Sequence, residues 1–222
     1  MLTGNTLKIL AAIAMVCDHA GLMFFPRLTI LRIIGRLAYP IFAFMIAEGC
    51  KYTRNKHRYF GMIFLLATLC QIVYFFVDGT LYLSILFTFS LSILTVYALQ
   101  YFKAKKNALS AAVFFTAVAG VWLLNQIFVI DYGFWGCMVP VFAAVFHNTK
   151  YDRPGVHILM LGAGLLLLSA DVGGIQIWSL LTLPLLLCYN GRRGKWKMKY
   201  FFYIFYPAHL VILQVIQWLI FA

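Results

Sequence analysis

Charged residues, and acidic ones above all, are scarce in this sequence. Only 11% of the 222 residues are charged, and six Asp plus Glu stand against 18 Lys plus Arg. A soluble domain has about 25% charged and roughly 45–50% apolar residues, whereas this chain is 64% hydrophobic. Disorder is also excluded, because the chain holds 21 Phe, 13 Tyr and 5 Trp. The composition therefore predicts a chain whose main solvent is a lipid bilayer.

Cysteine is sparse as well, and its spacing excludes two kinds of site. The five cysteines are odd in number, and no two form a CxxC pair. We therefore expect neither a disulfide framework nor a zinc site, and no other metal. The sequence also lacks an internal repeat, a low-complexity tract and a Pro- or Gly-rich linker. Residues 1–222 are accordingly predicted to form a single domain.

Polar clusters divide the chain into nine apolar stretches, each a candidate membrane-spanning helix. They are residues 6–25, 33–49, 59–77, 81–102, 108–130, 132–146, 156–170, 174–189 and 200–222. A helix needs about 20 residues to cross a bilayer core about 30 Å thick, so the sixth, seventh and eighth stretches are short for the task. The predicted fold class is an all-α polytopic membrane protein with about nine transmembrane helices.

Basic residues lie almost entirely on one side of these stretches. If the helices alternate in direction, 15 of the 18 basic residues fall on one side, at Lys8 and in residues 51–58, 103–106, 150–153 and 192–199. This asymmetry predicts the N-terminus inside and the C-terminus outside. It also explains the net charge of +12 by topology, so we expect no nucleic-acid partner.

Three polar side chains interrupt the first apolar stretch: Lys8, Asp18 and His19. Lys8 and His19 are 11 residues apart, so both project from one helix face, separated by about 16 Å along the axis. A neutral imidazole there is a candidate general base, and the alternative is a histidine that only bonds a neighbouring helix. Asp18 lies about 100° round the helix from His19, so it is expected to pair with another helix.

The second stretch carries Arg32 and Arg36, four residues apart and close in depth to Asp18. An ion pair between Asp18 and one arginine is expected. The alternative is that an arginine binds an anionic substrate or stabilises an oxyanion. Glu48, at the other end of this stretch, is a candidate substrate-binding residue, and its alternative is pairing at the surface with neighbouring basic residues.

The last stretch carries Tyr203, Tyr206 and His209, which recur every three residues. His209 is ten residues from the start of this stretch, a depth of about 15 Å and close to that of His19. The alternative is aromatic packing around one hydrogen-bonded histidine.

These residues carry a family resemblance. Residues 7–19, the segment LRIIGRLAYPIFAF at 31–44, YNGRRG at 189–194 and residues 200–209 resemble the TraX family. That family is typified by the protein that N-acetylates conjugative F pilin, and it belongs with the transmembrane acyltransferases, including the acyltransferase-3 O-acetylases. The wider group has an arginine, ten residues and a functional histidine in its first helix. Here Lys8 occupies the position of that arginine. Lysine keeps the positive charge but cannot bind a phosphate or carboxylate through two parallel hydrogen bonds, as a guanidinium does.

The resemblance implies an acyl-CoA-dependent O- or N-acyltransferase, most simply an acetyltransferase, in a bacterial inner or plasma membrane. Acetyl-CoA or another acyl-CoA would be the donor. The acceptor would be an amine or hydroxyl at or beyond the outer face, on a pilin or peptide N-terminus, a glycan or a lipid. A role in conjugation and self-association are left open. The rival hypotheses are a proton-coupled transporter or channel and a non-catalytic assembly protein whose polar residues lock helices together.

The implied site falls into three groups of residues. The catalytic candidates are His19, Asp18 and His209. The substrate-binding candidates are Arg32, Arg36, Glu48, Tyr203 and Tyr206. The candidates for holding the CoA phosphates are Lys8, Lys51, Arg54, Arg58, Arg192, Arg193 and Lys195; the alternative is that these cations only set topology and contact lipids.

Overall fold

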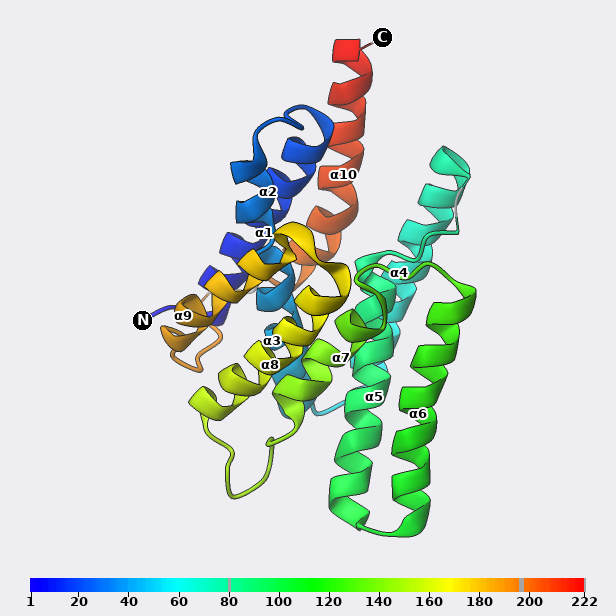
Figure 1. Cartoon of the computed structure of the whole chain (residues 1–222), viewed down its shortest axis with the longest axis vertical. Helices are drawn as coiled ribbons and strands as arrows, with labels where there is room; N and C mark the ends of the chain where they lie inside the picture. The colour runs from blue at the N-terminus through cyan, green and yellow to red at the C-terminus, as the bar shows by residue number, and fades with distance from the viewer. Residues whose placement is uncertain (80, 196–197, 222) are drawn as a thin grey trace. The chain divides into compact units, whose positions relative to one another are not determined.

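The computed structural model describes residues 1–79, 81–195 and 198–221, and it leaves aside the side chains of residues 77, 78, 199, 200, 202, 203 and 221. Every regular element in this part of the chain is a helix (Figure 1). The predicted all-α fold is therefore confirmed. The helices are α1 (Gly4–Met23), α2 (Thr29–Gly35), α3 (Ala38–Tyr52), α4 (Lys56–Asp78), α5 (Ile85–Lys105), α6 (Ala108–Ile127), α7 (Gly133–Ala144), α8 (Pro154–Val172), the 3₁₀ helix η1 (Gly174–Leu181), α9 (Thr182–Leu187) and α10 (Lys199–Phe221).

Several helices have the length and composition of membrane spans. Among the described residues, six segments are long and apolar enough to cross a membrane: Gly4–Met23, Thr29–Tyr52, Lys56–Phe76, Ile85–Lys105, Ala108–Ile127 and Pro154–Val172. Three shorter apolar helices are Gly133–Ala144, Gly174–Leu187 and Ile204–Ile220. The protein is therefore a multi-pass membrane protein. The orientation of its termini stays a prediction.

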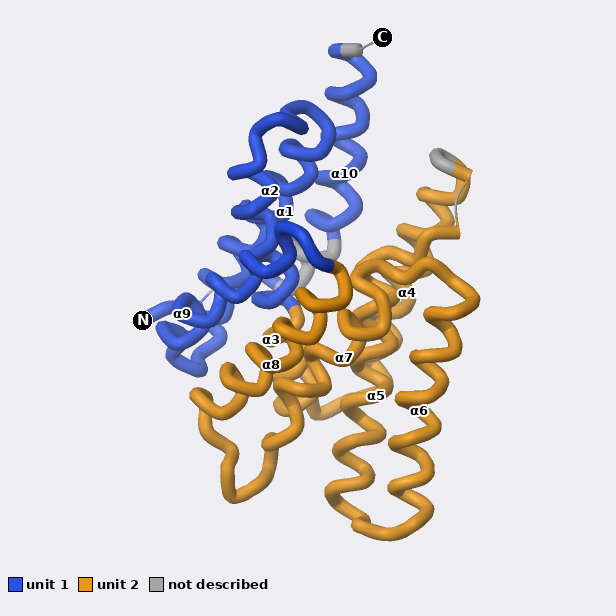
Figure 2. The backbone as a smooth tube through the Cα atoms, in the orientation of Figure 1, with its two compact units in different colours: residues 1–42, 173–222 blue, residues 43–172 orange. Residues whose placement is uncertain are grey.

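The chain forms two compact units, drawn in different colours in Figure 2. The first contains residues Met1–Phe42 and Gly173–Ala222, and the second contains Ala43–Val172. The expected single domain over residues 1–222 stays a prediction. Segments from both ends of the chain thus share the first unit.

The first unit contains a hairpin of α1 and α2, and η1, α9 and α10 pack with it. Thr3 begins α1 by accepting a hydrogen bond from the Thr6 N–H at 3.2 Å. Gly21 permits the close approach of α2, since a Cβ there would lie 2.9 Å from Leu31 Cβ. In this unit η1 packs against α2, α9 packs against η1, and α10 packs against α1. The hairpin therefore brings residues near 18 beside residues near 32.

The N-terminus is fastened to the segment between α9 and α10. The Leu2 N–H donates to the Cys188 carbonyl at 2.7 Å, and the Gly4 N–H donates to the Arg192 carbonyl at 2.8 Å. The Asn5 N–H donates to the Arg193 carbonyl at 3.0 Å. These bonds satisfy amides at the first turn of α1 that have no partner within the helix.

The second unit is built around α5, which packs against α4, α6 and α7, while α7 packs against α8. Hydroxyl groups on α5 bond back to their own helix: Ser90 donates to the Leu86 carbonyl at 2.8 Å, and Thr95 donates to the Leu91 carbonyl at 2.9 Å. Such bonds let hydroxyls lie inside an apolar helix without a partner elsewhere.

Candidate functional site

A charged cluster lies where α1 and α2 meet in the first unit. Arg36 Nη2 donates to both Asp18 carboxylate oxygens, at 2.6 and 2.7 Å, and Arg32 Nη1 donates to Asp18 Oδ2 at 3.1 Å. The side chains are largely buried, with exposed fractions of 12% for Arg36, 15% for Asp18 and 25% for Arg32. The expected pairing of Asp18 is therefore observed, and with both arginines. Two cations and one carboxylate leave a formal charge of +1.

Gly35 makes room for this cluster. A Cβ at Gly35 would overlap the Asp18 carboxylate and Cβ. The break between α2 and α3 follows directly, so that Arg36 lies just after the last turn of α2. The local sequence Arg-Ile-Ile-Gly-Arg thus places both guanidinium groups around one carboxylate.

Gln176 of η1 also belongs to this cluster. Arg36 Nη1 donates to Gln176 Oε1 at 3.2 Å, and Gln176 is 1% exposed. A guanidinium only donates hydrogen bonds, so the Gln176 oxygen must face Arg36 and its amide nitrogen must face away. Within the described structure, this Nε2 has no hydrogen-bond partner.

His19 and His209 lie together on the other flank of α1. Their ring centroids are 5.2 Å apart, and the planes meet at 78°. His19 Nδ1 lies 2.8 Å from the Met15 carbonyl oxygen, and His209 Nδ1 lies 3.0 Å from that of Phe205. A carbonyl only accepts, so both Nδ1 atoms carry hydrogen, and in the neutral rings both Nε2 atoms have a free lone pair.

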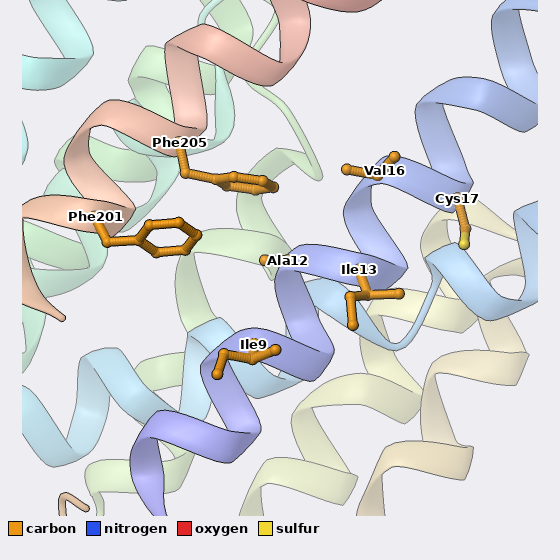
Figure 3. Close-up of a pocket in the computed structure, with 7 residues that line it drawn as sticks. All are labelled: Ile9, Ala12, Ile13, Val16, Cys17, Phe201 and Phe205. Atoms are coloured by element: carbon orange, nitrogen blue, oxygen red, sulfur yellow. The ribbon is translucent and has the colours of Figure 1, made fainter. Parts of the chain in front are cut away.

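Aromatic side chains of α10 hold the His209 ring. Phe205 stacks on it at 5.0 Å with planes 7° apart, and the Tyr206 ring lies 5.8 Å away. The side chain of Tyr203, a predicted substrate-binding residue, lies outside the described residues. Phe205 also lines an apolar groove of about 270 Å³, together with Phe201 and residues of α1 (Figure 3).

Basic side chains gather where the segment 188–194 meets the start of α1. Arg192, Arg193 and Lys195 are exposed, and Arg193 is close enough to repel Lys8. The backbone turns through Gly191 and Gly194, whose φ angles are +70° and +96°. Two more basic residues of this segment, Lys197 and the side chain of Lys199, lie outside the described residues. This arrangement presents the three exposed cations Arg192, Arg193 and Lys195 on one loop of the first unit.

A family model described as TraX protein matches residues 3–217, nearly the whole chain. The chain belongs to the TraX family. It is 27% identical, over 236 aligned residues, to a probable fimbrial assembly protein FimC, serogroup H1, of Dichelobacter nodosus, covering 93% of this chain and 92% of that protein. It is also 50% identical over 54 residues to an uncharacterized protein of Rickettsia prowazekii (strain Madrid E), covering 24% of this chain and 21% of that protein. No solved structure matches the chain.

The second unit of this TraX-family protein holds another polar cluster, which includes Lys51 and Glu48. Lys51 Nζ donates to Asp152 Oδ1 at 2.7 Å, so this cation already has a counter-charge, and its role in holding CoA stays a prediction. Glu48 is not a surface residue paired with Lys51: its side chain is only 12% exposed, and its oxygen lies 3.8 Å from His147 Nε2. Both belong to the second unit, as do Arg54 and Arg58, which are exposed.

His157 lies at the centre of this second cluster. Its Nδ1 is 3.2 Å from the Ala143 carbonyl oxygen, and its Nε2 is 2.8 Å from Asp152 Oδ1. These two contacts connect His157 of α8 both to α7 and to the carboxylate of Asp152.

The surroundings of this cluster shift the pKa values of two residues in the loop after α7, His147 and Asp152. Burial and the positive charges of His157 and Lys51 lower the pKa of His147 to about 3. Burial opposes ionisation of Asp152, yet hydrogen bonds from Lys51, the Asn148 N–H and His157 hold the pKa of Asp152 well below its ordinary value of 3.8. His147 is thus a neutral ring, and no hydrogen bond reaches either of its nitrogens from the described residues.

Sequence reasoning missed Gln176, His147, His157 and Asp152 as partners in buried clusters. His157 is the one that a visible signal could have found, because a histidine stands inside the apolar stretch 156–170. Gln176 also interrupts an apolar stretch, but an uncharged amide is a weaker signal. His147 and Asp152 lie in a polar loop, where nothing in the sequence separates a buried side chain from a solvated one.

Proposed function

We propose that this TraX-family protein is a membrane-integral acyltransferase, which moves an acyl group, most simply acetyl, from acyl-CoA to an amine or hydroxyl acceptor. The observation that carries the proposal is the pair of His19 and His209, whose Nδ1 atoms are tied to their own helices. Because each Nδ1 donates to a carbonyl of its own helix, the Nε2 atoms of the two neutral rings are left as basic nitrogens close together inside apolar helices. Acyl transfer to an amine or hydroxyl needs such a base.

In the proposed reaction, His19 Nε2 takes the proton of the acceptor group as the acceptor attacks the thioester carbonyl carbon. The carbonyl oxygen becomes an oxyanion. When the tetrahedral species collapses, the carbon–sulfur bond breaks, and the CoA thiolate takes the proton from the His19 imidazolium. His209 Nε2, which is buried and without a hydrogen-bond partner among the described residues, would accept a second hydrogen bond from the acceptor.

The cluster of Asp18, Arg32 and Arg36 supports the same reaction electrostatically. Its formal charge of +1 lies between α1 and α2, around Asp18, the residue next to His19 in the chain, and both helices belong to segments expected to be surrounded by lipid. Positive charge fixed in a region of low dielectric stabilises a developing oxyanion strongly. In this proposal Asp18 is a positioning residue, because both arginines already engage its carboxylate.

Donor and acceptor are expected to approach from opposite sides of the membrane. Arg192, Arg193, Lys195 and Lys8 form a basic surface suited to the CoA phosphates, on the side that the charge asymmetry predicts to be cytoplasmic. The printed name of the Dichelobacter relative is a fimbrial assembly protein. A pilus subunit with a free N-terminus is therefore the first acceptor to test, before glycans and lipids.

The test is acetyl transfer by the purified protein in nanodiscs, from radiolabelled acetyl-CoA to candidate pilin peptides and to membrane extract. We expect His19→Gln to lower the rate about 10²- to 10⁴-fold, the usual contribution of a general base. His57→Gln, an exposed histidine of the second unit, is the matched control and keeps the wild-type rate.

The outcomes separate the rival functions. Equal transfer by wild type and His19→Gln would overturn the assignment of the base. Absence of transfer to every acceptor, together with His19-dependent proton-coupled uptake into liposomes, would replace the enzyme with a transporter. If His19→Gln changes only thermal stability, the histidine pair serves helix packing alone.

A further inference from the structure

A row of buried polar groups runs along η1 and into α9, within the first unit. Gln176, Ser179 and Thr182 are three residues apart and are 1%, 0% and 0% exposed. A 3₁₀ helix has about three residues per turn, so side chains at this spacing lie one above the other. The three groups therefore form one line on the helix rather than a spiral.

All three members of the row carry an unsatisfied polar atom. Among the described residues, nothing hydrogen-bonds Gln176 Nε2, Ser179 Oγ or Thr182 Oγ1. The hydroxyls of Ser90 and Thr95 differ, because they donate to carbonyls four residues earlier in their own α-helix; Ser84 Oγ also has no partner among the described residues, but it stands alone rather than in a row. Buried polar groups without a partner are rare and costly, and three in one line call for a ligand or for water.

The ends of the row indicate what that ligand carries. At one end, Gln176 is hydrogen-bonded to Arg36 of the charged cluster. Beyond the other end, α9 leads into the segment that carries Arg192 and Arg193. The row itself spans about 12 Å, from six residues at about 2 Å rise each. A molecule that fits has a reactive end, an arm with hydrogen-bonding groups, and an anionic end.

We infer that the row of Gln176, Ser179 and Thr182 binds the amide-bearing pantetheine arm of the acyl-CoA donor. This inference rests on the proposed function, because it assumes that the donor is an acyl-CoA. The Gln176 amide, oriented by Arg36, donates to a carbonyl oxygen at the acyl end of the arm. The two hydroxyls, which both donate and accept, serve the amide groups of the arm.

The inference is tested by ligand-induced thermal shifts of the full-length protein in nanodiscs with two truncated probes. Acetyl-pantetheine carries only the arm, and adenosine 3′,5′-bisphosphate carries only the anionic end. We expect Ser179→Ala/Thr182→Val to lose most of the shift with acetyl-pantetheine and to keep the shift with the nucleotide. Arg193→Gln is expected to show the reverse.

Kinetics with acetyl-CoA supply a second readout. We expect the KM of Ser179→Ala/Thr182→Val for acetyl-CoA to rise at least about threefold, the effect of a hydrogen bond of ordinary strength. The variant Ser179→Ala/Thr182→Ser keeps a hydroxyl at position 182, and we expect its KM to lie between those of the wild type and Ser179→Ala/Thr182→Val. The matched control Ser90→Ala/Thr95→Val removes two hydroxyls that bond within their own helix, and it keeps the wild-type KM.

The outcomes distinguish this inference from the proposed function. Transfer that depends on His19 but retains the wild-type KM and acetyl-pantetheine shift in Ser179→Ala/Thr182→Val overturns the row as a binding site and assigns it to water. Binding of acetyl-pantetheine through the row without any acetyl transfer supports the row and contradicts the proposed function alone. A wild-type protein with no shift from either probe overturns the inference.

Discussion

Asp18 compensates two arginines in a helix that the bilayer is expected to surround. Replacing it by Asn would leave Arg32 and Arg36 partly buried without their counter-charge. Breaking a buried ion pair from one side costs about 3–5 kcal/mol, so we expect Asp18→Asn to melt at a clearly lower temperature in detergent. Circular dichroism during heating provides the measurement.

Two further variants make the Asp18 prediction specific. Asp171→Asn removes an exposed carboxylate from the end of α8 and should melt like the wild type. Asp18→Asn combined with Arg36→Gln removes one charge of each sign and should regain part of the loss. If Asp18→Asn melts like the wild type, the ion pairs contribute nothing to stability.

His147 makes the stability of the protein depend on acidity. In the unfolded chain this ring binds a proton near its ordinary pKa of 6.5, whereas burial and nearby cations lower the pKa in the folded protein to about 3. Between these values the unfolded state binds more protons, so stability falls as the pH falls from about 6.5 toward 3. We expect melting temperatures measured at pH 7, 6, 5 and 4 to decrease steadily.

His147→Phe isolates this contribution, since it keeps an aromatic ring that cannot be protonated. Its melting temperature should depend less on pH between about 6.5 and 4 than that of the wild type. The pKa of Asp152 is also lowered, so its stabilising contribution is lost only below 3.8 and should remain in the variant. An unchanged slope between pH 6.5 and 4 in His147→Phe would contradict the buried neutral state of His147.

At the scale of elements, the contact between α1 and α2 depends on Gly35, because only a residue without a side chain leaves room there for Asp18. We expect Gly35→Ala to push Asp18 away from the arginines, because the new Cβ would overlap its carboxylate. Overpacking of this kind costs about 1–3 kcal/mol, and displacement of the ion pairs adds to it. Thermal melting and the acetyl-transfer rate should both fall.

Gly120→Ala is the control for the glycine prediction. Gly120 lies inside α6, and nothing is within 4 Å of the position that its Cβ would take. Alanine there should leave stability unchanged or raise it by about 0.5–1 kcal/mol through helix propensity. Equal effects of the two substitutions would contradict a specific contact between Gly35 and Asp18.

The membrane-spanning helices and the charged residues inside them could be predicted from the sequence, whereas the 3₁₀ helix η1 could not. The apolar stretches correspond to helices because length and composition are enough to define a membrane span. The similar depth of His19 and His209 could be anticipated because the fixed rise of a helix converts residue number into depth, but depth alone does not predict that the two rings are neighbours. The alignment of Gln176, Ser179 and Thr182 could not be anticipated, because local apolar composition does not distinguish 3₁₀ from α-helical turns, and only 3₁₀ turns place side chains at this spacing directly above one another.

At the scale of the whole molecule, the asymmetry of basic residues sets a testable topology. We expect the C-terminus on the outer face and the loop around Lys103–Lys106 on the cytoplasmic face. Alkaline phosphatase fused after residue 222 should be active, and the same enzyme inserted after Lys106 should be inactive. Green fluorescent protein at the two positions should give the opposite pattern, and activity of alkaline phosphatase at the loop alone would reverse the orientation.

The chain order of the first unit also fixes when its charges are compensated during synthesis. Asp18 meets Arg32 and Arg36 within the next 18 residues, so the carboxylate can be neutralised while α1 and α2 enter the membrane as a hairpin. His209 and the carbonyls of Cys188, Arg192 and Arg193 are made well after α1 and α2. The carboxylate of Asp18 can therefore be paired before η1 and α9 are made, whereas the pair of His19 and His209 can form only after α10 has been made.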